Sequence, residues 1–183
     1  MFGMIRSLLR ALTAGMAAST GGFAVTLLAV AIVAPSSASA NPTGKPILHA
    51  GQILAVGEYL VAPNGQFFVM MQDDGNLVVY RGSGPSNQQG AIWASAQVGH
   101  YPHVVGAYYA VMQNDGNFAI YRGAGPSFNQ GFVWGTVQSG HYSPGLGNYF
   151  AVIQNDGNFV VYRGTGLANN SGPVWGSLQS VGR

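Results

Sequence analysis

Residues 72–80 read QDDGNLVVY, and nearly the same nine residues return twice further along the chain. The second copy, residues 113–121, reads QNDGNFAIY, and the third, residues 154–162, reads QNDGNFVVY. The glutamines that open the copies are 41 residues apart, and so are the three tryptophans, Trp93, Trp134 and Trp175. Self-similarity at a fixed period is the signature of a repeat architecture. The sequence therefore predicts three copies of one structural unit of about 41 residues.

Each copy has the pattern of a β-hairpin. Residues 67–72 and 77–81 are rich in β-branched and aromatic side chains, and they flank an Asp-Gly pair, which is a hairpin signal. In a three-residue loop over 73–75, Gly75 would take the left-handed conformation after a type I turn. A two-residue turn would instead turn the glutamine towards the core, where an amide is costly. We therefore expect the three-residue loop.

This loop decides where the polar side chains of the motif point. Gln72 then lies opposite Asn76, and paired residues share a face of the hairpin. By the two-residue period of a strand, Val78 and Tyr80 follow on that same face. The alternate side chains point into the core, namely Leu77 and Val79.

The remaining residues of each unit also indicate strands and tight turns. Residues 82–90 are a Gly/Pro/Ser/Asn loop, and residues 91–97 around Trp93 are predicted as a further strand. No segment outside the first 40 residues has a helical period. The fold class is therefore all-β, either a β-prism of three antiparallel sheets or a β-trefoil. The three tryptophans lie on apolar strands, so we expect them in the core.

A second set of upstream matches extends the repeat. We align Gly57-Glu58-Tyr59 with Gly99-His100-Tyr101 and Gly140-His141-Tyr142. His100 and His141 then match a glutamate in the first unit, so they form no symmetric set of metal ligands. We expect these histidines in loops or at strand ends, and we expect no metal or other cofactor.

The first 40 residues have the features of an export signal. Arg6 and Arg10 form a basic start, residues 21–34 are apolar, and Ala38-Ser39-Ala40 is a small-residue cleavage site. The alternative is an uncleaved membrane anchor over residues 11–34. We predict a signal peptide over 1–40, a domain of three repeats over 41–183, and a secreted or periplasmic protein.

Composition excludes several classes of function. Residues 41–183 hold five Lys or Arg and five Asp or Glu, so the domain is neutral and lacks the basic surface that nucleic acids require. The chain has no cysteine, hence no disulfide framework. Glycosidases need two carboxylates in unlike environments, whereas Asp74, Asp115 and Asp156 are equivalent copies and Glu58 is the single glutamate. We therefore expect no enzymatic activity.

The exposed face of each motif carries a mixture of hydrogen-bond donors and acceptors beside a small apolar side chain. Two amides, a carboxylate and a phenol suit a ligand with several hydroxyl groups, such as a sugar ring. A purely structural role for the turns is the alternative interpretation. A turn needs only the Asp-Gly pair, so this alternative does not explain why the whole pattern Gln-x-Asp-x-Asn-x-x-x-Tyr is intact three times.

This triple motif resembles that of the bulb-type, or monocot mannose-binding, lectin family. The stretches Ala50-Gly51-Gln52-Ile53-Leu54 and Ile92-Trp93-Ala94-Ser95 are similar to family segments as well, so the resemblance covers essentially all of residues 41–183. It implies a β-prism II fold with a shallow mannose pocket at each motif. The departures are the missing intramolecular disulfide of plant members and longer linking loops.

The resemblance also implies a role for each motif residue. In the first motif, Asp74 and Asn76 would hold the 2-hydroxyl of mannose, Gln72 the 3-hydroxyl and Tyr80 the 4-hydroxyl, while Val78 would touch the ring carbons. The third motif would repeat these roles with Gln154, Asp156, Asn158, Val160 and Tyr162. The middle motif keeps the polar set of Gln113, Asp115, Asn117 and Tyr121. There Ala119 replaces the valine, which should weaken this pocket by about 1 kcal/mol.

The sequence thus predicts a secreted, non-enzymatic lectin for mannose-containing glycans or polysaccharides. The alternatives are a lectin-like bacteriocin, in which sugar binding serves targeting, and a structural or protein-binding module without a sugar site. Family members often exchange a C-terminal strand, so a homodimer through residues 174–178 is a further expectation. Contact with a membrane is expected only through an uncleaved leader.

Overall fold

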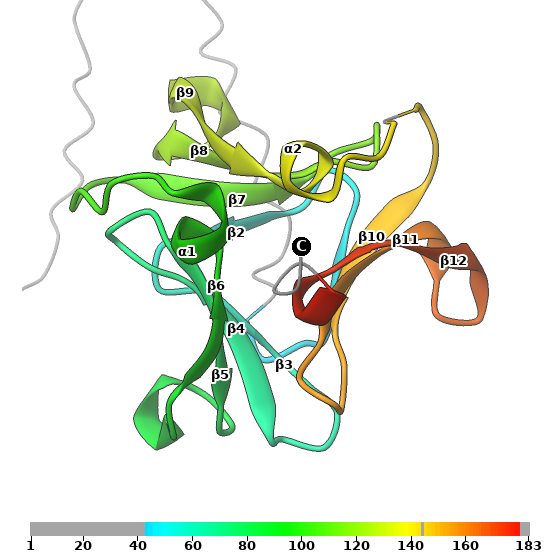
Figure 1. Cartoon of the computed structure of the whole chain (residues 1–183), viewed down its shortest axis with the longest axis horizontal. Coiled ribbons are helices and arrows are strands. Elements are labelled where there is room, and N and C mark those ends of the chain that lie inside the picture. Colours follow the sequence, from blue (N-terminus) through cyan, green and yellow to red (C-terminus); the bar gives the residue numbers. More distant parts are fainter. Residues whose placement is uncertain (1–42, 144, 180–183) are drawn as a thin grey trace, which may run out of the picture. The chain divides into compact units, whose positions relative to one another are not determined.

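The computed structural model describes residues 43–143 and 145–179, which form three four-stranded antiparallel sheets. The first sheet has the order β3 (Tyr59–Val61), β4 (Phe67–Met71), β5 (Leu77–Arg81), β6 (Ala91–Ala94). The second has the order β2 (Ile53–Ala55), β7 (Tyr108–Met112), β8 (Phe118–Gly123), β9 (Asn129–Gly135). The third has the order β1 (Ile47–His49), β10 (Tyr149–Ile153), β11 (Phe159–Gly166), β12 (Asn169–Gly176). The sheets surround a common centre like the faces of a prism (Figure 1), so the predicted β-prism is confirmed and the β-trefoil is not.

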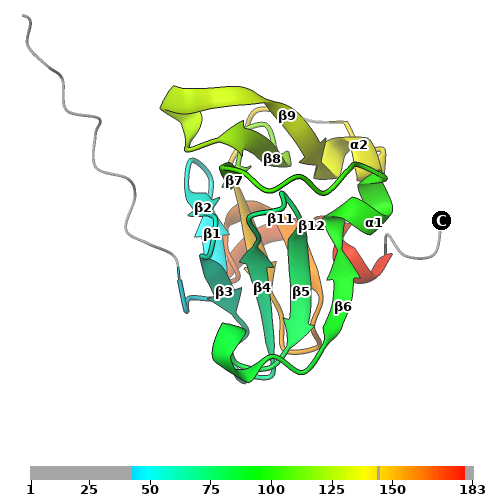
Figure 2. The same ribbon diagram turned by 90° about the vertical axis from the view of Figure 1, so that its left-hand side faces the viewer.

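The N-terminal segment contributes one edge strand to every sheet. β3 pairs with β4 of its own repeat, but β2 pairs with β7 of the second repeat and β1 pairs with β10 of the third. Figure 2 shows the four strands of the first sheet side by side, with β3 at one edge and β6 at the other. Each 41-residue repeat therefore supplies three strands of a sheet, and the fourth comes from residues 47–61.

This arrangement corrects the upstream alignment of the repeats. Tyr59 lies in β3, whereas Tyr101 and Tyr142 follow two single-turn helices, α1 (Ser95–Gly99) and α2 (Thr136–Gly140). The Gly-x-Tyr matches are therefore not structurally equivalent. The three tyrosines match in sequence but have unrelated roles. Tyr59 is a half-buried strand residue, whereas Tyr101 and Tyr142 each donate a hydrogen bond through the hydroxyl.

The predicted hairpin loop is confirmed in all three copies. The Gln72 N–H donates to the Asn76 carbonyl at 2.9 Å, so these residues oppose each other as predicted, and equivalent bonds close the other two loops. Gly75 has a φ of 84°, which is the left-handed conformation that glycine adopts without strain. Leu77 and Val79 are fully buried in the core.

The three tryptophans meet in the centre of the prism. Their ring centroids are 5.5 to 5.8 Å apart in edge-to-face contacts, and each side chain is at most 4% exposed. The prediction that they are core residues is confirmed. One wholly buried leucine from each N-terminal strand joins the same core, namely Leu48, Leu54 and Leu60.

The strand predicted over residues 91–97 is shorter than expected. β6 ends at Ala94, and the chain then forms α1, which is capped at its C-terminus by His100 in the left-handed conformation with φ 51°. Side-chain bonds to the first helical residue, Ser95, stabilise this turn. The close approach of Gly99 to the Trp134 ring leaves no room for a Cβ there. Two further single-turn helices of the 3-10 type, η1 (Pro85–Asn87) and η2 (Pro126–Phe128), lie in the loops, and η3 (Ser177–Gln179) follows β12.

The predicted signal peptide and its cleavage site lie outside the described residues. Within residues 43–143 and 145–179, no helix has the length and apolarity needed to cross a membrane. The segment over residues 174–178, predicted to exchange between chains, pairs with β11 of its own chain: Trp175 is aligned with Val161 and Gly176 with Val160. A homodimer by strand exchange stays a prediction.

Candidate functional site

The glutamine and the tyrosine of each motif form a hydrogen-bonded pair on the outer face of their sheet. Nε2 of Gln72 donates to the Tyr80 hydroxyl at 2.6 Å. The same bond measures 3.0 Å in the middle motif and 2.8 Å in the third. Because the hydroxyl accepts this bond, its own hydrogen is left for an acceptor other than the glutamine. The pair thus presents one donor, the phenol O–H, and one acceptor, the glutamine Oε1.

The aspartate and the asparagine are oriented by bonds within the protein. Oδ1 of Asp74 accepts the Asn76 N–H at 2.9 Å, and the aspartates of the other motifs do the same. Oδ1 of Asn76 accepts the Ala96 N–H at 3.0 Å and the Ser95 hydroxyl at 3.1 Å. Its carbonyl oxygen is therefore fully used, and the Nδ2 group is the part of the amide left to meet a ligand.

The hydroxyl that holds the asparagine was missed by our sequence interpretation. Ser95 also accepts the buried Leu77 N–H at 2.9 Å. Thr136 and Ser177 have the same two roles in the other units. The signal was present in the sequence, because a serine or threonine stands two residues after each tryptophan.

The apolar floor of each motif lies on the predicted face but exposes almost nothing. Val78 and Tyr80 pack with Phe68 in a small outer cluster, and Phe68 stacks on Tyr80 at 5.1 Å between ring centroids. The stack recurs in the second sheet at 5.6 Å and in the third at 5.4 Å. Ala119 of the middle motif is wholly buried. Its smaller side chain therefore changes the packing beneath Tyr121 and not an exposed wall.

The turn of each of the first two motifs is held by residues of the next repeat. The Tyr101 hydroxyl donates to the Gly75 carbonyl at 3.1 Å, and Tyr142 donates to Gly116 at 2.6 Å. A Cβ on Gly75 would lie 2.8 Å from the Tyr108 ring, so only glycine fits this contact. Burial raises the pKa of Tyr101 to about 12, and it raises the pKa of Tyr142 to about 12 as well. Both hydroxyls are therefore kept as neutral donors.

The three motifs differ in their surroundings. At the first, Nδ1 of His103 lies 2.8 Å from Oδ2 of Asp74. At the third, Asp156 is exposed, and the Asn64 side chain bonds the neighbouring Asn155 carbonyl at 2.9 Å. At the second, the exposed Phe132 of β9 lies beside Tyr121.

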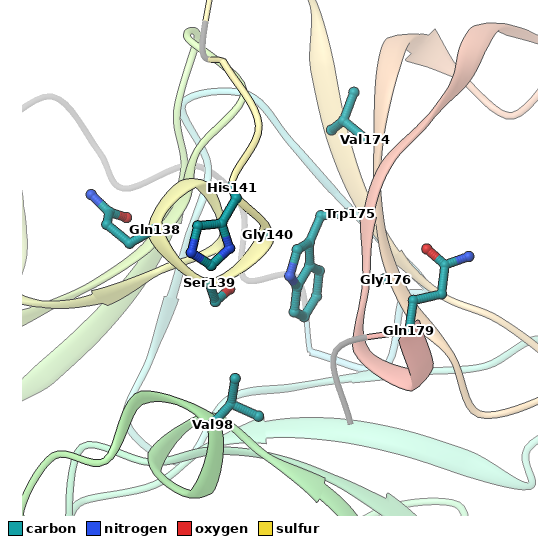
Figure 3. A pocket seen from close by; sticks show the side chains of 9 residues that line it. All are labelled: Val98, Gln138, Ser139, Gly140, His141, Val174, Trp175, Gly176 and Gln179. Carbon is teal, nitrogen blue, oxygen red and sulfur yellow. The ribbon is translucent and has the colours of Figure 1, made fainter. Parts of the chain in front are cut away.

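Two hollows in the protein surface lie at different distances from the motifs. One of about 450 Å³ borders the first motif and is lined by Val56, Gly57, Met70, Gln72, Asp73 and Asp74. Another of about 450 Å³ lies at the helical end of the prism, where His141, which caps α2, and Trp175 of β12 face one space (Figure 3). None of the predicted site residues lines this second hollow. In the described part of the chain, no group of three His, Asp or Glu residues is arranged to hold a metal ion.

The chain matches no protein-family model and no curated protein. Among solved structures, it resembles a monomeric monocot mannose-binding lectin from Gastrodia elata, with a TM-score of 0.51 and 29% identity over 73% of this chain and 96% of the other. It is also 31% identical to the mannose-specific agglutinin of snowdrop (Galanthus nivalis) bulbs, over 64% of this chain and 89% of the other, with a TM-score of 0.47. The chain belongs to the bulb-type lectin family.

A third solved structure is similar to this chain in its fold, at a lower sequence identity. A mannose-specific lectin from Dutch crocus (Crocus vernus) superposes with a TM-score of 0.50 at 20% identity, over 69% of this chain and 95% of the other. The prism of three four-stranded sheets is therefore the β-prism II fold of bulb-type lectins.

Proposed function

We propose that the protein is a lectin that binds mannose-type sugars through up to three shallow sites, one per motif. The sites consist of Gln72, Asp74, Asn76, Val78 and Tyr80 in the first repeat, of Gln113, Asp115, Asn117 and Tyr121 in the second, and of Gln154, Asp156, Asn158, Val160 and Tyr162 in the third. Two solved relatives are named as mannose-binding or mannose-specific proteins, and the snowdrop agglutinin was solved with methyl-α-D-mannoside. Those names support the sugar class.

The observation that carries the proposal is the set of polar atoms that each motif leaves for a ligand. Internal bonds use the asparagine Oδ1, one aspartate oxygen and the glutamine Nε2. The asparagine Nδ2 and the phenol O–H remain as donors, and the aspartate Oδ2 and glutamine Oε1 remain as acceptors, although in the first motif Nδ1 of His103 already lies 2.8 Å from that Oδ2. Neighbouring hydroxyls on one edge of a pyranose each need a donor and an acceptor, and this set supplies two of each.

The strength of one site also explains why there are three. About four net hydrogen bonds of about 1 kcal/mol each give only millimolar affinity. Three such sites on one rigid body raise avidity about 10²- to 10⁴-fold towards a clustered glycan. An equatorial 2-hydroxyl would leave the aspartate and asparagine without a partner, which discriminates against glucose.

We further propose that the protein acts outside the cytoplasm after removal of residues 1–40. The basic start, the apolar run and Ala38-Ser39-Ala40 support this. A mass measurement of the protein recovered from its producing cells tests it, because cleavage after Ala40 leaves a chain that begins at Asn41.

Retention on a mannose matrix tests the lectin proposal directly. The purified protein should bind the matrix and elute with free mannose, but not with galactose. Passage straight through the column by protein with an intact β-sheet circular dichroism spectrum would refute sugar binding. Tyr80→Phe and Tyr162→Phe keep the ring stacks and remove the donor, so each should weaken retention while leaving the melting temperature close to that of the unmodified protein.

A further inference from the structure

The middle motif has an aromatic neighbour that the other two lack. Phe132 of β9 contacts Tyr121 edge-to-face, with ring centroids 5.8 Å apart, and it is 47% exposed. In the strand register, Phe132 is the residue aligned with Tyr121. The residues aligned with the equivalent tyrosines are Ala91 in the first sheet and Pro173 in the third. A large, half-exposed apolar ring thus lies beside the motif tyrosine in the middle site only.

The surface next to Phe132 is hollowed. A cleft of about 270 Å³ is lined by Phe132, Gly135 and Gln138, together with residues of α1. Gly135 lies against the Asn117 side chain, because a Cβ added to this glycine would be 2.7 Å from Oδ1 of Asn117 and 2.8 Å from Oε1 of Gln138. The cleft therefore adjoins the asparagine of the middle motif, and Gln138 lines it with an exposed amide.

The hairpin that carries Phe132 is fixed from beneath. Tyr109 of β7 stands where the other sheets have Phe68 and Phe150, and the side chain of Asn129 lies close to its hydroxyl and interacts with it. Oδ1 of Asn129 in turn accepts the Gly131 N–H at 2.7 Å. Both contacts involve Asn129, which is the first residue of β9 and lies three residues before Phe132, and β9 itself pairs with β8 of the second sheet. The ring is therefore presented on a strand anchored to the same sheet as Tyr121.

We propose that the middle site contains a second subsite, which takes the sugar unit linked to the bound mannose and stacks its apolar face on Phe132. This rests on the proposed function. Sugar sites combine an aromatic or apolar wall with a few polar groups that fix orientation, and here Phe132 is the wall and Gln138 offers the amide. The middle site would then prefer a disaccharide, whereas the other two would treat a mannoside and a mannobiose alike.

Nuclear magnetic resonance resolves the three sites in one sample. The backbone amides of Gly75, Gly116 and Gly157 each lie in one motif and report its occupancy during a titration. The probes are methyl α-mannoside and the α-1,2-, α-1,3- and α-1,6-linked mannobioses. At the Gly116 signal, one mannobiose should bind more tightly than the monosaccharide. Phe132→Ala should weaken that mannobiose about three- to tenfold and change methyl mannoside binding less than twofold.

Two further variants control the result. Phe128→Ala removes another exposed phenylalanine, from η2 just before β9, and should leave both affinities unchanged. Ala91→Phe installs a ring at the equivalent place of the first site and should strengthen mannobiose binding at the Gly75 signal only. An unchanged ratio of mannobiose to mannoside affinity in Phe132→Ala, or an equal loss in Phe128→Ala, overturns the subsite. If no mannoside moves any of the three signals, the lectin function itself is wrong.

Discussion

Nδ1 of His103 lies 2.8 Å from Oδ2 of Asp74, so an imidazole from the second repeat occupies the free carboxylate oxygen of the first motif. The carboxylate is about one quarter exposed and the histidine about half exposed. Asp115 and Asp156 have no such partner among the described residues. A sugar hydroxyl that enters the first site therefore meets the imidazole at this oxygen.

Removal of this imidazole should strengthen the first site. His103→Ala frees Oδ2 of Asp74, and because exposed charge-assisted contacts contribute little, we expect affinity for methyl mannoside to rise about two- to fivefold at the Gly75 signal. The Gly116 and Gly157 signals, in motifs that this histidine does not touch, serve as internal controls. Weaker binding at Gly75 would show that His103 holds the carboxylate in place for the ligand.

Loss of the serine that holds Asn76 should affect both stability and binding. Ser95→Ala leaves the buried Leu77 N–H without its acceptor, which should lower the free energy of unfolding by about 1 to 3 kcal/mol. Binding at the first site should weaken as well, since Oδ1 of Asn76 loses a donor. Denaturant unfolding and titration measure the two effects. Ser95→Thr is the matched control, because Thr136 has this role in the second repeat, and it should preserve both properties.

The glycine beneath Trp175 should not tolerate a methyl group. A Cβ on Gly140 would lie 2.6 Å from Cδ1 of Trp175, inside the central tryptophan cluster. We expect Gly140→Ala to destabilise the protein by about 1 to 3 kcal/mol, as overpacking of a core does. Gly145→Ala, where nothing lies within 4 Å, should show no such loss in thermal unfolding. Equal melting temperatures for the two variants would contradict the packing described for the prism centre.

Stability should fall in strongly alkaline solution. Burial raises the pKa of Tyr101 and of Tyr142 from 10.0 to about 12, so between these values the unfolded chain loses protons that the folded chain keeps. The contribution of these two tyrosines to the free energy of unfolding is therefore fully present below about pH 10, and it declines as the pH rises towards 12. Denaturant midpoints across this range measure the decline. Tyr101→Phe, less stable at neutral pH because its hydrogen bonds are lost, should show a shallower decline.

The hairpin and its two faces were predictable from the sequence because their causes are local. Asp-Gly sets the loop, and the two-residue period then places Asn76 and Tyr80 outward and Leu77 inward. The central position of the tryptophans was predictable too, since equal spacing on apolar strands leaves few other places for three large rings.

Contacts between repeats could not be predicted in the same way. His103 reaches Asp74 across 29 residues, and Ser95 reaches Asn76 only because the chain turns into α1 after β6. The pairing of β1 with β10 joins residues about a hundred positions apart. Nothing in the local pattern of residues 47–49 distinguishes this partner from a strand of the first repeat.

That long-range pairing determines the order in which the prism can be completed. β1 is the first described strand to be synthesised, yet its partner β10 is made only after the first two hairpins are finished. During synthesis on the ribosome, Leu48 and Leu54 must wait for strands of later repeats before they are covered. Loop closure over such separations is slow compared with hairpin formation. The nascent chain therefore completes its third sheet by a return to its own beginning, and a chain that stops before residue 153 leaves β1 without its full partner strand.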